Sequence, residues 1–388
     1  MNKNVCIYTG TTFETASHEH ILQASLGARW DSDKLICEDM QRHFSGPIDT
    51  AVADVVSELR TLFGTKNGRG VEPPTIKHVV AGDGATYHVK PGMQPVMAEP
   101  TYTIEEKAGQ MRVKFEMADI SQMGWAMAKF RRENPDLKLD EDSRGEATRA
   151  QTYLPAPLPF KLTLGGKDFF RGILKSAFNL LGAKFPSLAL HVGFDPLKTF
   201  IVHGTGDSDP FVRWVTSPDQ FDLPRLGEID HLLALWSRDG EVFGILQLFG
   251  DIPFLLRLGD GIECSDFECG YLVNPLRDTN PAEDRVPVID PAAIPRFEDN
   301  PILPGSEVWK AFTARMSRIM ETLQQRGTEE RVKQIVDEVF LPHDGKLITA
   351  GMVAEFKDRM RALLENLLSP PSFPNGNHRM ASEFPDAE

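Results

Sequence analysis

The chain has 388 residues, of which 41% are hydrophobic and 25% charged, and its formal net charge is −14 at pH 7. This composition is ordinary for a folded globular protein, and the length favours two or three domains. The acidic balance excludes a broad basic surface, so a nucleic-acid ligand would need a local basic strip or a metal ion. Four cysteines imply no disulfide framework, and no apolar run suits a signal peptide or a membrane span. We therefore expect a cytoplasmic protein with no membrane partner.

Residues 1–70 are predicted to form a small unit with the order strand, strand, helix. The three predicted elements are 3–10, 34–37 and 47–64. The helix has apolar residues at helical spacing, with Pro47 near its start and Gly64 at its end. A polar loop, or a strand that runs into a loop, is expected at 18–27 between the two strands. The polar residues that follow the helix are expected to form a linker.

Residues 75–275 are predicted to form a mixed body of helices and antiparallel sheet. Short alternating segments in 75–118 predict hairpin strands. Helical spacing predicts helices at 119–134, where Asp119 is a candidate cap, and at 167–185. An antiparallel meander is expected to pack on the second helix. Its predicted segments are 199–204, 231–250 and 252–261, with a tight turn at Arg238-Asp239-Gly240.

The last part of the chain is predicted to be helical. Residues 274–305 are rich in proline and aspartate and are expected to form an extended linker. The helical C-terminal segment, 306–368, has a break at 342–345. Its helices could pair with a second copy to form a homo-oligomer, or pack within one chain, and the sequence leaves both open. Residues 369–388 are expected to be a disordered tail.

Two adjacent residues of the first unit, Glu19 and His20, suit a metal centre for hydrolysis. A histidine can deprotonate water beside a metal-bound phosphate, and an adjacent carboxylate can hold the metal. Gln41 and His43, where the chain enters its helix, are candidates for the third ligand. His18 shares a strand face with His20 and is a further candidate, although a solvated histidine is the more ordinary interpretation.

This stretch resembles the HNH endonuclease family, the ββα-metal nucleases. One branch of that family carries C-x-x-C, then S/T-x-E-H-I-I-P-x-x-L-G-G, then C-x-x-C-N-x-x-F-G and an aspartate before a helix. The matching residues are Cys6, Glu19, His20, Ile21, Leu26, Gly27, Cys37, Phe44 and Asp49. The resemblance implies His20 as general base, Glu19 as a ligand of Mg²⁺ or Mn²⁺, and Gln41 at the place of the family's asparagine or histidine ligand.

The stretch departs from the family pattern at its cysteines. Thr9 stands at the second cysteine position and Met40 at the fourth, so that only Cys6 and Cys37 remain. Because a structural zinc ion normally needs four ligands, we expect no structural zinc and expect Thr9 and Met40 to fill its space. Gln41 is longer than the asparagine of the pattern and would shift a bound metal.

Two hypotheses about function follow. The first is a metal-dependent HNH-type endonuclease that hydrolyses nucleic-acid phosphodiester bonds, with DNA the favoured substrate. In it His20 is the general base, and Glu19 with Gln41 or His43 holds the metal. The second is a catalytically degenerate HNH-like protein that acts as a binding or assembly component. In both cases the expected fold class is α+β: an N-terminal ββα-metal (HNH-like) unit, a mixed helix and antiparallel-sheet body, and a helical C-terminal segment.

Overall fold

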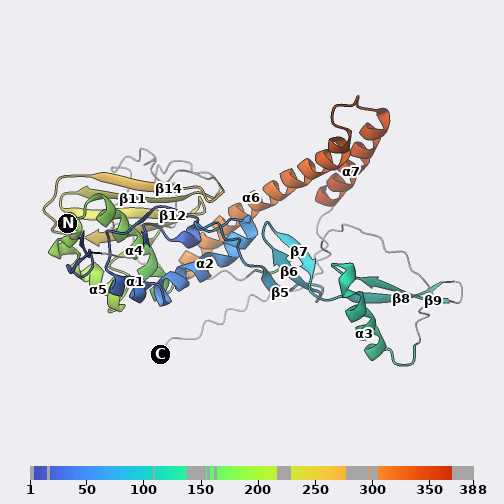
Figure 1. Cartoon of the computed structure of the whole chain (residues 1–388), viewed down its shortest axis with the longest axis horizontal. Coiled ribbons are helices and arrows are strands. Elements are labelled where there is room, and N and C mark those ends of the chain that lie inside the picture. The colour runs from blue at the N-terminus through green and yellow to red at the C-terminus, as the bar shows by residue number, and fades with distance from the viewer. Residues whose placement is uncertain are drawn as a thin grey trace. The chain divides into compact units, whose positions relative to one another are not determined.

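The computed structural model of the chain combines helices with antiparallel sheets, which confirms the predicted α+β class (Figure 1). The structure describes residues 4–14, 18–107, 110–137, 154, 158–160, 164–215, 229–276, 297 and 305–368. The chain divides into two compact units. Unit 1 comprises Met1–Ile76, Val89–Gln94 and Lys161–Gly327, and unit 2 comprises Lys77–His88, Pro95–Phe160 and Thr328–Glu388. The predicted tail and most of the predicted linker at 274–305 lie outside the described residues.

Unit 1 begins with two short antiparallel strand pairs. β1 (Asn4–Val5) pairs with β2 (Thr12–Phe13), and β3 (Glu19–His20) pairs with β4 (Asp31–Ser32). The predicted strand at 34–37 is wrong: those residues form a loop, in which the Leu35 carbonyl accepts a hydrogen bond of 3.0 Å from the Ile7 N–H. Leu35 and Ile36 are buried in this loop, which accounts for the apolar run. The 3₁₀ helix η1 (Ala24–Leu26) follows β3. That these elements form a ββα-metal unit stays a prediction.

Two helices follow these strands, α1 (Glu38–Phe44) and α2 (Pro47–Phe63). α2 confirms the predicted helix, with proline in its first turn and Gly64 after it at φ 68°, a conformation that favours glycine. One face of α2 is buried against helix α4 (Lys167–Lys184), which confirms the predicted helix at 167–185. The approach is close, because a Cβ on Gly172 of α4 would lie 2.5 Å from Val52 Cγ2 of α2.

The predicted strand at 199–204 is wrong, because these residues belong to helix α5 (Asp195–His203). Pro196 lies in the first turn of α5, and Gly204 ends it at φ 64°. The apolar run that suggested a strand is one buried face of this helix. The 3₁₀ helices η3 (Leu188–Leu190) and η4 (Val192–Phe194) join α4 to α5.

The predicted meander is confirmed as part of a five-stranded antiparallel sheet in the order β10-β13-β12-β11-β14. Its strands are β10 (Val212–Trp214), β11 (His231–Arg238), β12 (Glu241–Leu248), β13 (Ile252–Gly259) and β14 (Glu268–Val273). The turn between β11 and β12 has positive φ at Asp239 (51°) and Gly240 (79°), as a tight hairpin requires.

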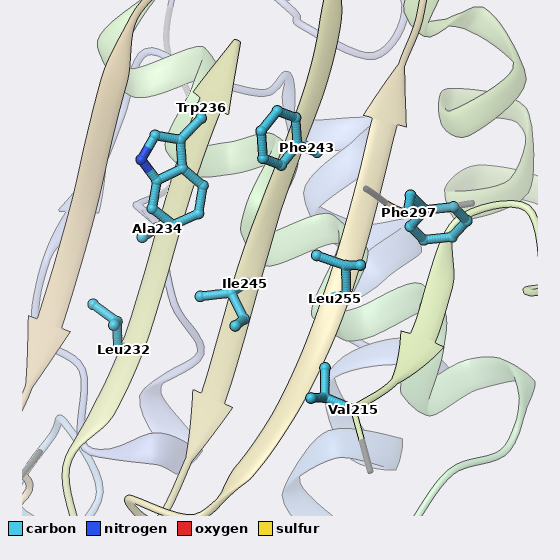
Figure 2. Packing of buried hydrophobic residues seen from close by; sticks show 8 residues of the cluster. All are labelled: Val215, Leu232, Ala234, Trp236, Phe243, Ile245, Leu255 and Phe297. Atoms are coloured by element: carbon cyan, nitrogen blue, oxygen red, sulfur yellow. The ribbon is translucent and has the colours of Figure 1, made fainter. Parts of the chain in front are cut away.

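Both faces of this sheet are buried. Figure 2 shows the cluster on one face, which comprises Val215, Leu232, Ala234, Trp236, Phe243, Ile245, Leu255 and Phe297. Helix α4 packs on the sheet, where the rings of Phe169 and Phe254 lie 5.7 Å apart. α4 is therefore enclosed between α2 and the sheet, which makes it the central helix of unit 1.

A second group of elements begins with a three-stranded sheet of β5 (Ile76–Val80), β6 (Thr86–Lys90) and β7 (Gln94–Met97). A hairpin of β8 (Thr101–Lys107) and β9 (Gln110–Glu116) follows, then η2 (Ile120–Gln122) and α3 (Met123–Glu133). These elements confirm the strands and helix predicted in 75–134. Asp119 accepts a hydrogen bond of 2.9 Å from the Ser121 N–H and so caps η2.

The C-terminal helices are α6 (Gly305–Phe340) and α7 (Ala350–Leu368), separated by η8 (Leu341–His343), as predicted. α7 packs against the end of α6 through Ile335, Val339, Met352 and Leu363. This packing lies within one chain. That the same helices also pair with a second copy stays a prediction. None of the helices in the described part of the chain combines the length and the hydropathy needed to cross a bilayer.

Candidate functional site

A buried lysine lies between two carboxylates of unit 1. Lys175 Nζ is 2.7 Å from Glu19 Oε1 and 2.7 Å from Asp49 Oδ1. Only 2% of the Lys175 side chain and 3% of the Glu19 side chain are exposed, against 32% for Asp49. Burial alone would lower the pKa of Lys175, but the attraction of both carboxylates outweighs it and raises that pKa above its ordinary value. The lysine is therefore charged at neutral pH.

Further hydrogen bonds hold Glu19 and Asp49 in place. Asn179, one helical turn after Lys175, donates from Nδ2 to Glu19 Oε1 (2.9 Å) and to the His20 carbonyl (3.1 Å). The Tyr8 hydroxyl donates to Asn179 Oδ1 (3.0 Å), and burial raises the Tyr8 pKa, which keeps this donor protonated. We name this set, with Gln23, the Lys175 cluster; its members are Tyr8, Glu19, Gln23, Asp49, Lys175 and Asn179.

The local fold explains how these residues meet. Asp49 lies in the first turn of α2, and Gln23, just before η1, donates from Nε2 to Asp49 Oδ1 at 3.2 Å. Lys175 and Asn179 lie in the middle of α4, which is buried on nearly every side. Polar groups in such a position are costly unless they are paired. Lys175 and Asn179 pair with residues of β3 and α2, so these three elements of unit 1 share one buried polar cluster.

The predicted general base, His20, lies beside the Lys175 cluster and is half-buried. Burial is the main cause that lowers the pKa of His20; Asp31 acts in the opposite direction, and Arg69 lowers the pKa further. A lowered pKa leaves the imidazole neutral at pH 7, the form that can accept a proton. His18 is exposed instead, with Nδ1 2.9 Å from Asp31 Oδ1, and this partner raises the His18 pKa.

The two candidate third ligands lie on α1. His43 Nε2 is 2.7 Å from the carbonyl oxygen of Val202 in α5, so this ring is held by α5. Gln41 Oε1 is buried and has no hydrogen-bond partner within the described residues. Across the ranges that the structure describes, no group of three or more histidine, cysteine, aspartate and glutamate side chains is arranged to hold a metal ion. The structure thus brings Glu19 together with Lys175, Asn179 and Asp49.

Four residues correspond to the zinc ligands of the family that the sequence resembles. Cys6 and Thr9 lie between β1 and β2, Cys37 lies just before α1, and Met40 lies in α1. Cys6 and Met40 are buried, and Cys6 and Cys37 are free thiols. Burial raises the pKa of the Cys6 thiol, but hydrogen bonds from the Thr9 hydroxyl and from backbone N–H groups, including that of Cys37, outweigh burial and lower it. Cys6, Thr9 and Cys37 therefore lie close together. The expected lack of a structural zinc stays a prediction.

Sequence reasoning missed Tyr8, Gln23, Lys175 and Asn179. The available signal was a lysine and an asparagine four residues apart within the apolar pattern of 167–185. Two polar residues at that spacing lie on one face of a helix, and a helix buried on both sides must find partners for them. The signal indicated that partners exist, but it did not indicate which residues supply them.

No family model, curated protein or solved structure matches this chain. The resemblance to the HNH endonuclease family rests on the residues quoted for it within 6–50.

Proposed function

We propose that this chain is a catalytically degenerate HNH-like protein that acts as a binding or assembly component. One observation carries the proposal. The carboxylate of Glu19, to which the resemblance assigns the metal, is enclosed and already bound by the ammonium of Lys175 at 2.7 Å. A metal ligand must offer its oxygen to an incoming ion, and Glu19 Oε1 is used twice, by Lys175 and by Asn179.

Electrostatic repulsion argues against a divalent cation beside this lysine. A doubly charged ion about 4 Å from an ammonium is repelled by roughly 8 kcal/mol at an effective dielectric constant of about 20. A cation with a Kd of about 1 mM gains only about 4 kcal/mol on binding. The repulsion is the larger quantity, so a cation would bind Glu19 only after Lys175 had moved away from the carboxylate.

The assembly part of the proposal is supported by exposed apolar side chains on the α6–α7 hairpin. They are Val336, Leu341, Leu347, Ile348 and Leu364. Leu347, in the loop between η8 and α7, is 91% exposed. We propose a second copy of the chain as the protein partner and nucleic acid, with DNA favoured, as the ligand. Both proposals extend the sequence predictions.

One observation favours the metal-dependent endonuclease as a second candidate. His20 is neutral, half-buried and next to Glu19, as a general base requires. In this candidate, Glu19 with Gln41 or His43 would hold Mg²⁺ or Mn²⁺. Lys175 would have to release Glu19, and a His43 ligand would have to leave the Val202 carbonyl.

A combined cleavage and binding assay separates the two candidates. Supercoiled plasmid, linear duplex, single-stranded DNA and RNA are incubated with native protein and Mg²⁺, Mn²⁺ or chelator, and binding is followed by fluorescence anisotropy. We expect binding without cleavage. Metal-dependent cleavage that is lost in His20→Ala, and kept in the exposed neighbour control His18→Ala, would refute the degenerate function and establish the endonuclease.

A further inference from the structure

We propose that Lys175 is an internal counter-ion that fills a site suited to a hard divalent cation. The inference deepens the proposed function, on which it rests, by naming what occupies the degenerate centre. In this view the positive charge that a bound ion would supply between β3, α2 and α4 is attached covalently to α4. Removing that charge should open the site to Mn²⁺ or Ca²⁺.

The groups around the Lys175 ammonium have the chemistry of hard-cation ligands. Two carboxylate oxygens, Glu19 Oε1 and Asp49 Oδ1, lie at the same distance of 2.7 Å from Nζ. Gln23, which is 7% exposed, donates a hydrogen bond from Nε2 to Asp49. Its Oε1 is buried and has no hydrogen-bond partner in the described part of the chain. Carboxylate and amide oxygens are the ligands that Ca²⁺, Mg²⁺ and Mn²⁺ prefer.

The remaining surroundings also suit a cation. The Phe44 ring lies with its centroid 5.0 Å from Nζ, within range of a cation–π contact. Asn179 offers the site only its neutral amide, and its Nδ2 holds the Glu19 oxygen in position. The oxygens of Glu19 and Asp49 would therefore keep their places when the ammonium is removed.

The charge balance shows why the ammonium and a divalent ion exclude each other. Glu19 and Asp49 contribute −2 and Lys175 contributes +1, so the native set carries −1. Loss of the lysine charge leaves −2 in a site with little exposed surface, which is unfavourable unless a cation enters. A divalent ion restores neutrality, and it would do so without the repulsion that it meets in the native protein.

The test compares Lys175→Met, which keeps an apolar side chain without the charge, with native protein and with Lys198→Met. Lys198 is a matched control because it is a buried lysine of unit 1 paired with one acid, Asp195, at 3.2 Å. Mn²⁺ binding is measured by electron paramagnetic resonance and calorimetry, and thermal unfolding is recorded with Mn²⁺, Ca²⁺ or chelator. We expect Lys175→Met to bind Mn²⁺ at least tenfold more tightly than either of the other two proteins.

The variants should also differ in how Mn²⁺ changes their unfolding temperature. Lys175→Met should unfold at a lower temperature in chelator and recover part of the loss in Mn²⁺, and the additional change Glu19→Gln should abolish that recovery. Equal Mn²⁺ affinity in Lys175→Met and native protein would overturn the inference. Mn²⁺ binding by native protein would also overturn the inference if the substitution Glu19→Gln abolished that binding.

Failure to fold also has a defined meaning. If Lys175→Met does not fold, Lys175→Gln replaces it, since glutamine keeps a hydrogen-bond donor. If neither variant refolds in millimolar Mn²⁺ while Lys198→Met does, the inference is overturned, because the added cation should replace the lost one. Cleavage is measured separately, so cleavage by a native protein that binds no Mn²⁺ at Glu19 would refute only the proposed function.

Discussion

Replacing Glu19 by glutamine tests whether this acid is a structural partner of Lys175. The substitution keeps the shape and one carbonyl oxygen but removes the charge. Glu19 Oε1 accepts from Lys175 at 2.7 Å and from Asn179 at 2.9 Å. A hydrogen bond to a charged group contributes about 1.5–3 kcal/mol and a neutral one about 0.5–1.5 kcal/mol. Over two bonds, we expect Glu19→Gln to lower the free energy of unfolding by about 1–3 kcal/mol.

The partner that remains sets an upper limit on this loss. Leaving a buried charge without any partner costs about 3–5 kcal/mol, but Asp49 still pairs with Lys175 in Glu19→Gln. The assay is urea unfolding followed by circular dichroism and tryptophan fluorescence. The control is Asp39→Asn, which breaks the Asp39–Arg42 pair at 2.6 Å, whose side chains are 84% and 70% exposed. Exposed pairs of this kind contribute little, so the control should unfold like native protein.

Two outcomes would refute the reasoning about Glu19. A Glu19→Gln protein as stable as native protein would show that the pair with Lys175 adds no stability. A native protein that Mg²⁺ or Mn²⁺ stabilises, together with a Glu19→Gln protein that neither ion stabilises, would identify Glu19 as a metal ligand.

Two further substitutions test the packing and the titration of unit 1. Gly172→Ala places a Cβ 2.5 Å from Val52 Cγ2 and should cost about 1–3 kcal/mol in thermal unfolding. Gly124→Ala, in α3 of unit 2 with nothing within 4 Å, should leave the unfolding of unit 1 unchanged. Equal melting of unit 1 in the two variants would contradict the close approach of α2 and α4. His231 is buried, burial lowers its pKa to about 3, and its Nδ1 accepts from the Phe249 N–H. Because an unfolded histidine titrates near 6.5, its contribution is fully present above about pH 6.5 and falls by about 1.4 kcal/mol per pH unit as pH drops toward 3. His231→Asn, which keeps an acceptor but does not titrate, should lose less stability than native protein between pH 7 and pH 5 in urea unfolding; parallel losses would exclude His231 as the cause.

The sequence predicted the long helices well because their signals are local and repeated. Residues 47–64 and 167–185 each carry several turns of apolar periodicity, and the first also carries proline and glycine at its ends. The two wrong strands, 34–37 and 199–204, are short apolar runs, in which helix, strand and buried loop look alike. At 199–204, the deciding residues were Asp195 and Pro196, which start a helix just before the run.

The site was predictable only where its residues are close in sequence. Glu19 and His20 are consecutive on β3, so their backbones lie together in any fold, although their side chains leave the strand on opposite faces. The charged partner of Glu19, Lys175, comes from α4. Asn179, its second partner on this helix, is 160 positions away from Glu19 in the sequence. The motif predicts a carboxylate at position 19. A buried carboxylate requires a positively charged partner, which can be a metal ion or a lysine. The motif thus predicts the position of the negative charge of Glu19. The positive charge that pairs with it comes from helix α4, which lies outside the motif. In this chain that helix supplies a lysine, and the resemblance alone could not distinguish it from a metal.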